Sequence, residues 1–116
     1  PENILLDRHG GRAVVTDFGI AREFDTLADG DATRLTRDGH VLGTLHYVSP
    51  EQAMGGALDG RSDLYSLGVV GWQLLSGRLP FDDVSGPGVL VAHATRPAPP
   101  LLGAAPHVPA ALAAVI

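Results

Sequence analysis

Apolar and polar positions alternate in short blocks at the start of the chain. Residues 4–6 (Ile-Leu-Leu) and 13–15 (Ala-Val-Val) are two apolar runs, and residues 8–11 (Arg-His-Gly-Gly) lie between them. Two short apolar runs around a glycine-containing turn are typical of a β-hairpin. The pattern therefore predicts a hairpin within residues 1–19.

The next stretch, residues 22–44, shows no apolar period. Asp, Thr, Gly and Arg are interleaved there, and apolar residues are few. Loops of this length inside compact domains are usually functional or disordered. We therefore expect a long mobile loop of one of these two kinds.

The clearest helical pattern covers residues 61–76. We expect Ser62 to be the N-cap, and Asp63 places negative charge in the first turn, where the helix dipole favours it. Apolar residues then recur at spacings of three and four, and Gly77 stands where a C-cap glycine belongs. The recurring positions are Leu64, Leu67, Val70, Gly71, Leu74 and Leu75.

The flanks of this helix are apolar as well. Val69 and Trp72 lie beside the main stripe, so we expect a helix that is buried on most sides, with Trp72 in the core. Gly68 and Gly71 each cost roughly 1 kcal/mol relative to Ala inside a helix, and a closely packed neighbouring backbone would explain them.

Beyond Phe81 the chain is rich in Pro and Gly. Residues 89–94 are expected to form a short helix, and residues 96–100 must be extended because each proline disfavours helix in the residue before it. Residues 109–116 are predicted to be a helix that begins with Pro109 in its first turn.

The composition excludes several classes of function. The chain has 116 residues and no Cys, and its eight basic residues are all Arg. A disulfide framework, a thiolate metal site and a mechanism that runs on a Lys amine of this chain alone are therefore excluded. The formal net charge of −5 argues against nucleic acid as a partner. No apolar stretch reaches the roughly 20 residues of a membrane helix, so we expect no membrane contact from this segment.

Histidine offers no metal site either. The five His residues, at positions 9, 40, 46, 93 and 107, lack the spacing of metal ligands, and we interpret them as surface or structural residues.

Two oxygen-bearing side chains, Asn3 and Asp17, flank the predicted hairpin. The open ends of an antiparallel pair lie side by side, with opposed residues about 5 Å apart. An amide oxygen and a carboxylate at that separation suit Mg²⁺, which takes one or two protein oxygens and the rest from phosphates and water. The same spacing is also found for ordinary polar residues at the end of a hairpin. Such residues are more common than metal ligands at these positions.

The motifs that accompany Asp17 point to one family. In their order and spacing they resemble the catalytic half of a serine/threonine protein kinase of the bacterial receptor-like type. The motifs are PEN (1–3), DFGIAR (17–22), GTLHYVSPEQ (43–52), DLYSLGVV (63–70) and GRLPF (77–81). The resemblance implies part of an α+β kinase fold, namely the larger, mainly helical lobe with one β-hairpin at the cleft.

The resemblance also divides the chain into parts of a kinase domain. Residues 1–19 would be a metal-binding hairpin, and residues 17–51 the activation segment. Residues 61–76 would be the central helix, and residues 82–116 the helices that follow it.

The resemblance assigns catalytic roles. Asn3 and Asp17 would hold the metal ions, Mg²⁺ or alternatively Mn²⁺, that bridge the phosphates of ATP. Gly19 would be the hinge that lets Asp17 swing, and Phe18 its apolar anchor. Thr44 would steady the catalytic-loop carboxylate and lysine while shaping the acceptor site; a plain turn threonine is the alternative.

The end of the activation segment would have structural roles. Gly43 belongs to its last motif, and Ser49 and Pro50 stand in the place where Ala-Pro is commonest. Glu51 would anchor the segment through an ion pair with an arginine near the C-terminus of the domain. We expect that partner beyond Ile116.

Two residues of the predicted central helix also match. Asp63 would accept hydrogen bonds from the backbone of the catalytic loop; simple helix-start acidity is the alternative, and both can hold. Gln73 replaces a glutamate that is common on this helix, a change that need not affect catalysis.

Regulation would act through Thr36 and Thr33 in the loop. Thr36 ranks first because it lies seven residues before Gly43. A phosphate there adds nearly two negative charges and can order a segment by pairing with arginines, which occur at positions 22, 34 and 37. A solvated loop threonine explains either position equally well.

Taken together, these motifs imply a fragment of a serine/threonine kinase that transfers the γ-phosphate of ATP to protein hydroxyls. The chain starts at Pro1 rather than Met, and the glycine-rich loop, the strand lysine and the catalytic aspartate are expected before it, so we expect this segment alone to be inactive. The alternative is a truncated or pseudokinase-like remnant that acts at most as a binding module. The expected location is cytoplasmic. The full-length parent could carry one membrane helix and form a homodimer for phosphorylation of its loop.

Overall fold

The computed structural model describes residues 3–16 and 45–116. The chain divides into two compact units, residues 1–31 and residues 32–116. The predictions for residues 17–44, which include the DFG motif and the long loop, lie outside the described residues, as do Pro1 and Glu2.

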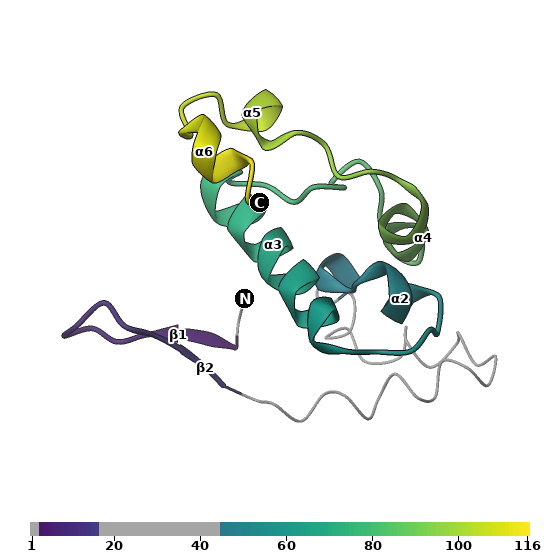
Figure 1. Cartoon of the computed structure of the whole chain (residues 1–116), viewed down its shortest axis with the longest axis horizontal. Coiled ribbons are helices and arrows are strands. Elements are labelled where there is room, and N and C mark those ends of the chain that lie inside the picture. The colour runs from purple at the N-terminus through teal and green to yellow at the C-terminus, as the bar shows by residue number, and fades with distance from the viewer. Residues whose placement is uncertain (1–2, 17–44) are drawn as a thin grey trace. The chain divides into compact units, whose positions relative to one another are not determined.

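The first unit contains the predicted β-hairpin. Strands β1 (Ile4–Leu6) and β2 (Ala13–Val15) pair antiparallel, with Ile4 opposite Val15 and Leu6 opposite Ala13 (Figure 1). The turn is closed by backbone bonds of Asp7, and Gly11 has a φ of +64°, a conformation that favours glycine. The strand positions and the glycine turn are thus confirmed.

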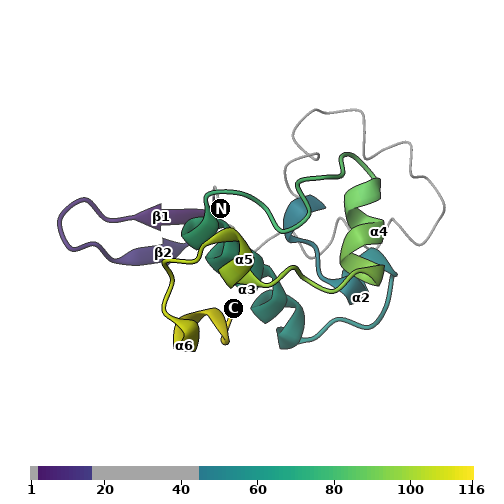
Figure 2. The same ribbon diagram turned by 90° about the horizontal axis from the view of Figure 1, so that it is seen from above.

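The described part of the second unit is helical. Its elements are a 3₁₀ helix η3 (Leu45–Tyr47) and the helices α2 (Pro50–Ala53), α3 (Gly60–Ser76), α4 (Gly88–Thr95), α5 (Leu101–Ala104) and α6 (Ala110–Ala113). Figures 1 and 2 show α2 and α4 beside the N-terminal end of α3, and α5 and α6 beside its C-terminal end. Helix α3 is therefore the element around which this unit is organised. None of the described helices combines the length and the apolar character that crossing a bilayer needs.

Both ends of α3 are capped, but only one cap is the predicted one. Gly77 has a φ of +76° and donates its N–H to the Gln73 carbonyl at 2.8 Å, which confirms it as the C-cap. The N-cap is Asp59, whose carboxylate accepts the Arg61 N–H at 2.9 Å. The expectation that Ser62 is the cap was wrong, because the extended backbone at Asp59 starts the helix three residues earlier.

The expectation that α3 is buried on most sides was also wrong for the described residues. Val69, Val70 and Trp72 are buried, whereas Leu64, Leu67 and Leu74 are exposed. The reason is that η3, α2 and α5 pack along only part of the helix surface. The close approach expected at Gly71 exists, because a Cβ there would lie 2.7 Å from the Ile116 side chain. At Gly68 the neighbour is the backbone oxygen of Ile116, 3.8 Å from where a Cβ would lie, which is an ordinary contact.

Trp72 forms a core with the C-terminal helices. Its indole packs with Leu101, Ala105 and Val108, and its Nε1–H donates to the Pro99 carbonyl at 3.3 Å. The core position predicted for Trp72 is confirmed.

Of the remaining predictions for the C-terminal part, some are confirmed and one is wrong. Helix α4 covers the predicted residues 89–94, and residues 96–100, which were predicted to be extended, contain no helix. The last helix, α6, spans only four residues after Pro109, so the prediction over 109–116 was too long. The short helices α2 and α5 were not predicted.

Candidate functional site

The open end of the hairpin fixes the backbone of Asn3. Both the backbone N–H and the hydroxyl of Thr16 donate to the Asn3 carbonyl, at 2.8 and 3.3 Å. The register therefore places Asn3 opposite Thr16, while Asp17, the next residue in sequence, lies outside the described residues. The carboxamide of Asn3 extends from a backbone position held by two hydrogen bonds.

The chemistry of Asn3 fits a hard divalent cation. A carboxamide oxygen is an accepted ligand of Mg²⁺, which commonly takes only one or two protein oxygens and completes its shell with phosphate and water. Within residues 3–16 and 45–116, no group of three or more His, Asp or Glu side chains comes together.

Helix α2 begins at Ser49 with a complete capping box. The Ser49 hydroxyl accepts the Gln52 N–H at 3.3 Å, and the Gln52 amide oxygen accepts the Ser49 N–H at 2.9 Å. Pro50 occupies the first helical position, where its missing N–H costs nothing. Ser49 is fully buried. These contacts give the Ser-Pro-Glu motif a rigid local structure.

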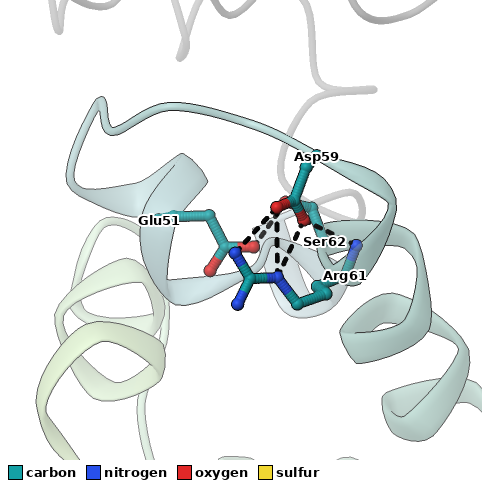
Figure 3. Close-up of polar contacts among 4 residues, drawn as sticks. All are labelled: Glu51, Asp59, Arg61 and Ser62. Carbon is teal, nitrogen blue, oxygen red and sulfur yellow. Dashed lines mark hydrogen bonds and ion pairs between the residues drawn. The ribbon is translucent and has the colours of Figure 1, made fainter.

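Glu51 of α2 is linked to the start of α3. The buried Ser62 hydroxyl donates to the Glu51 carboxylate, as Figure 3 shows. The pKa of Glu51 is lowered, first by this bond and then by hydrogen bonds from its own backbone N–H and from Ser49. Among the described residues, a serine of α3 therefore holds the carboxylate for which an arginine was expected.

An ion pair lies beside this contact. Arg61 donates to Asp59 through Nε and Nη2, with a Nη2–Oδ2 distance of 2.8 Å (Figure 3). The pair lowers the pKa of Asp59, and it raises the pKa of Arg61 with a smaller contribution from the charge of Glu51. Because both side chains are exposed, the pair adds little stability and mainly sets local charge.

Tyr47, two residues before Ser49, makes two further bonds to α3. The Ser66 hydroxyl donates to the Tyr47 carbonyl at 2.6 Å, and the Tyr47 hydroxyl donates to the Gln73 amide oxygen at 2.7 Å. Sequence reasoning gave no role to Ser66. The sequence feature that could have indicated a role for Ser66 is its spacing of four residues from Ser62, because this spacing places both hydroxyls on one face of a helix.

Asp63 lies in the first turn of α3 and is exposed. The expected helix-start position is confirmed. The hydrogen bonds expected between Asp63 and the backbone of the catalytic loop stay a prediction.

His93 of α4 is a structural residue, one of the two roles expected for the histidines. Its ring is buried, its Nδ1 lies 2.8 Å from the Tyr65 hydroxyl of α3, and it meets the Phe81 ring edge-on. Burial lowers the pKa of His93, against a hydrogen bond with the His46 backbone that raises it. Burial likewise raises the pKa of Tyr65. His93 therefore connects α4 with α3 and with η3.

Comparison with known proteins gives matches over most or all of the chain. A family model described as the protein kinase domain matches residues 1–96. The serine/threonine-protein kinase Pkn1 of Myxococcus xanthus is 49% identical and PrkC of Bacillus subtilis is 41% identical, each across the whole chain. PknA of Mycobacterium tuberculosis is 43% identical over 87% of this chain. The chain spans only 16% of Pkn1, 17% of PrkC and 22% of PknA.

Proposed function

Because this chain belongs to the protein kinase family, we propose that it forms part of the catalytic domain of a serine/threonine protein kinase. The family implies ATP, a divalent metal ion and protein substrates. The complete protein would transfer the γ-phosphoryl group of ATP to a serine or threonine hydroxyl, leaving ADP. The hairpin followed by helices agrees with part of an α+β kinase fold.

The proposal rests first on the hairpin. Asn3 is held opposite Thr16 by two hydrogen bonds, and Asp17 follows Thr16 directly in the sequence. We assign Asn3 and Asp17 to the binding of Mg²⁺, or alternatively Mn²⁺. When bound, such an ion neutralises charge on the phosphates during transfer. The role of the hairpin is to fix the backbone from which the Asn3 carboxamide extends.

The segment that ends at Glu51 would carry the acceptor. We assign Thr44 to the acceptor site, with residues 45–51 as its rigid continuation. The contacts of Tyr47 and Glu51 with α3 support this assignment, because they give the segment a fixed support. Thr36 and Thr33 stay our candidates for regulatory phosphorylation, supported by the arginines near them in the sequence.

A chimeric kinase tests the proposal. Residues 1–116 replace the matching segment of Pkn1, and the product, here called the Pkn1 chimera, is assayed for transfer of labelled γ-phosphate from Mg·ATP to dephosphorylated casein. We expect transfer, and we expect Asp17→Asn to reduce it at least about a hundred-fold, because positioning and charge neutralisation are most of this catalysis.

The matched control is Asp7→Asn in the same hairpin. The Asp7 carboxylate accepts the His9 N–H in the turn, at the far end of the strands from Asn3, so this variant should keep its activity. A folded chimera that binds ATP but transfers nothing, beside active Pkn1, would contradict the proposal. That result would favour a remnant without catalysis.

A further inference from the structure

Helix α3 presents a line of hydrogen-bonding side chains to one neighbouring segment. Ser62, Ser66 and Gln73 share a face of the helix, since they are separated by four and seven residues. Their partners all belong to residues 47–51: Ser62 donates to Glu51, Ser66 donates to the Tyr47 carbonyl, and Gln73 accepts from the Tyr47 hydroxyl. One face of α3 thus holds both ends of a five-residue stretch.

Residues 45–51, which include this stretch, contain closely packed side chains. Leu45 and Val48 are almost completely buried, and Ser49 is fully buried within its capping box. The carbonyl of the partly buried Tyr47 accepts a hydrogen bond from the Ser66 hydroxyl at 2.6 Å. The same hydroxyl also reaches the Ser62 carbonyl at 3.1 Å, which fixes its rotamer on the helix.

We propose that Ser62 and Ser66 are positioning residues for the protein acceptor. The two serines fix the position of residues 45–51 on α3. Because the acceptor would bind against residues 45–51, the serines also fix the surface that it contacts. This inference rests on the proposed function, in which that segment carries the acceptor. Neither serine belongs to the metal-holding hairpin, so removing a hydroxyl should weaken acceptor binding and leave ATP binding unchanged.

The experiment measures KM for casein and KM for ATP separately in the Pkn1 chimera. The variants are Ser66→Ala and Ser62→Ala, and the conservative variant is Ser66→Thr, which keeps a hydroxyl. Alanine favours helix, so these variants should fold, and melting temperatures are recorded beside the kinetics. The matched control is Ser76→Ala, because the Ser76 hydroxyl on the same helix also donates to a backbone carbonyl, that of Arg78, outside the segment.

We expect each alanine variant at Ser66 or Ser62 to raise KM for casein roughly three- to ten-fold, the factor that corresponds to one hydrogen bond, with KM for ATP unchanged. Ser66→Thr and Ser76→Ala should stay near the unsubstituted chimera. An unchanged KM for casein in an active chimera would overturn this inference, as would equal changes for casein and ATP or an equal change in Ser76→Ala. Absence of transfer in the unsubstituted chimera would instead overturn the proposed function.

Discussion

Replacing Trp72 should show how much the C-terminal core contributes to stability. The indole is only 4% exposed and packs against Leu101, Ala105 and Val108. Truncating a buried aromatic side chain to alanine typically costs about 3–5 kcal/mol, because apolar burial is lost and a cavity stays behind. The change also leaves the Pro99 carbonyl without its indole donor, which adds on the order of 1 kcal/mol unless water enters. We therefore expect Trp72→Ala to cost at least about 3 kcal/mol.

A graded series separates these contributions. Trp72→Phe keeps an aromatic ring but loses the hydrogen bond and part of the volume, so it should cost about 1–2 kcal/mol. Val91→Ala on α4 is the control, because its side chain is 62% exposed and its replacement should change stability by about 0.5 kcal/mol or less.

The assay is urea unfolding of the Pkn1 chimera, followed by far-ultraviolet circular dichroism. With an m-value near 3 kcal/mol per M, Trp72→Ala should lower the midpoint by about 1–2 M. The reasoning is refuted if Trp72→Ala costs no more than Val91→Ala, since the indole would then make no net contribution through its packing.

Two further predictions concern pH and a glycine cap. Burial lowers the pKa of His93 below its usual 6.5, so the unfolded chain binds the proton more readily than the folded protein. Stability should therefore be level above a pH of about 6.5, fall as the pH drops from there to the folded-state pKa, and level off again below that pKa. Melting temperatures between pH 5 and 8 should show this slope, and His93→Gln should remove that part of it; an identical slope in both proteins would contradict the assignment. Gly77→Ala should destabilise by about 1 kcal/mol because its φ is +76°, whereas Gly60→Ala at the start of the same helix should be neutral or stabilising. Thermal unfolding of both variants checks this, and equal effects would show that the left-handed cap is not the cause.

The hairpin could be predicted from the sequence because its information is local. Two apolar runs and the glycine turn lie within residues 4–15, and the observed register joins them as the pattern requires. The C-cap at Gly77 could be predicted for the same reason, because the glycine directly follows the helical pattern in the sequence. Short helices such as α2 and α5 were missed because four residues between prolines and glycines carry no helical period.

The start of α3 shows why local patterns were insufficient elsewhere. Asp59 and Ser62 are both good cap residues, and only the backbone conformation decides between them. Ser62 is freed from capping and instead binds Glu51, eleven residues earlier in the chain. That contact depends on α2 packing against α3, a tertiary arrangement that helical periodicity does not contain.

The candidate site was predicted through its motifs rather than through its contacts. The sequence marked Asn3 and Glu51, and the structure shows the Asn3 backbone fixed and Glu51 with a defined partner. The supporting role of Ser66 was not marked, because a serine inside a helix is usually no more than a tolerated residue. Its contact with Tyr47 appears only when the two segments are packed together.

Trp72 has a consequence for how this protein is observed in solution. It is the only tryptophan in the chain, and its indole lies in the core shared by the C-terminal end of α3 and α5. Intrinsic tryptophan fluorescence from this chain will therefore report the hydration of that core, and it will not report the contact between Glu51 and Ser62. If residues 45–51 separate from α3 before the C-terminal helices separate, the emission spectrum will stay native-like while the contacts of Tyr47 and Glu51 with α3 are already lost.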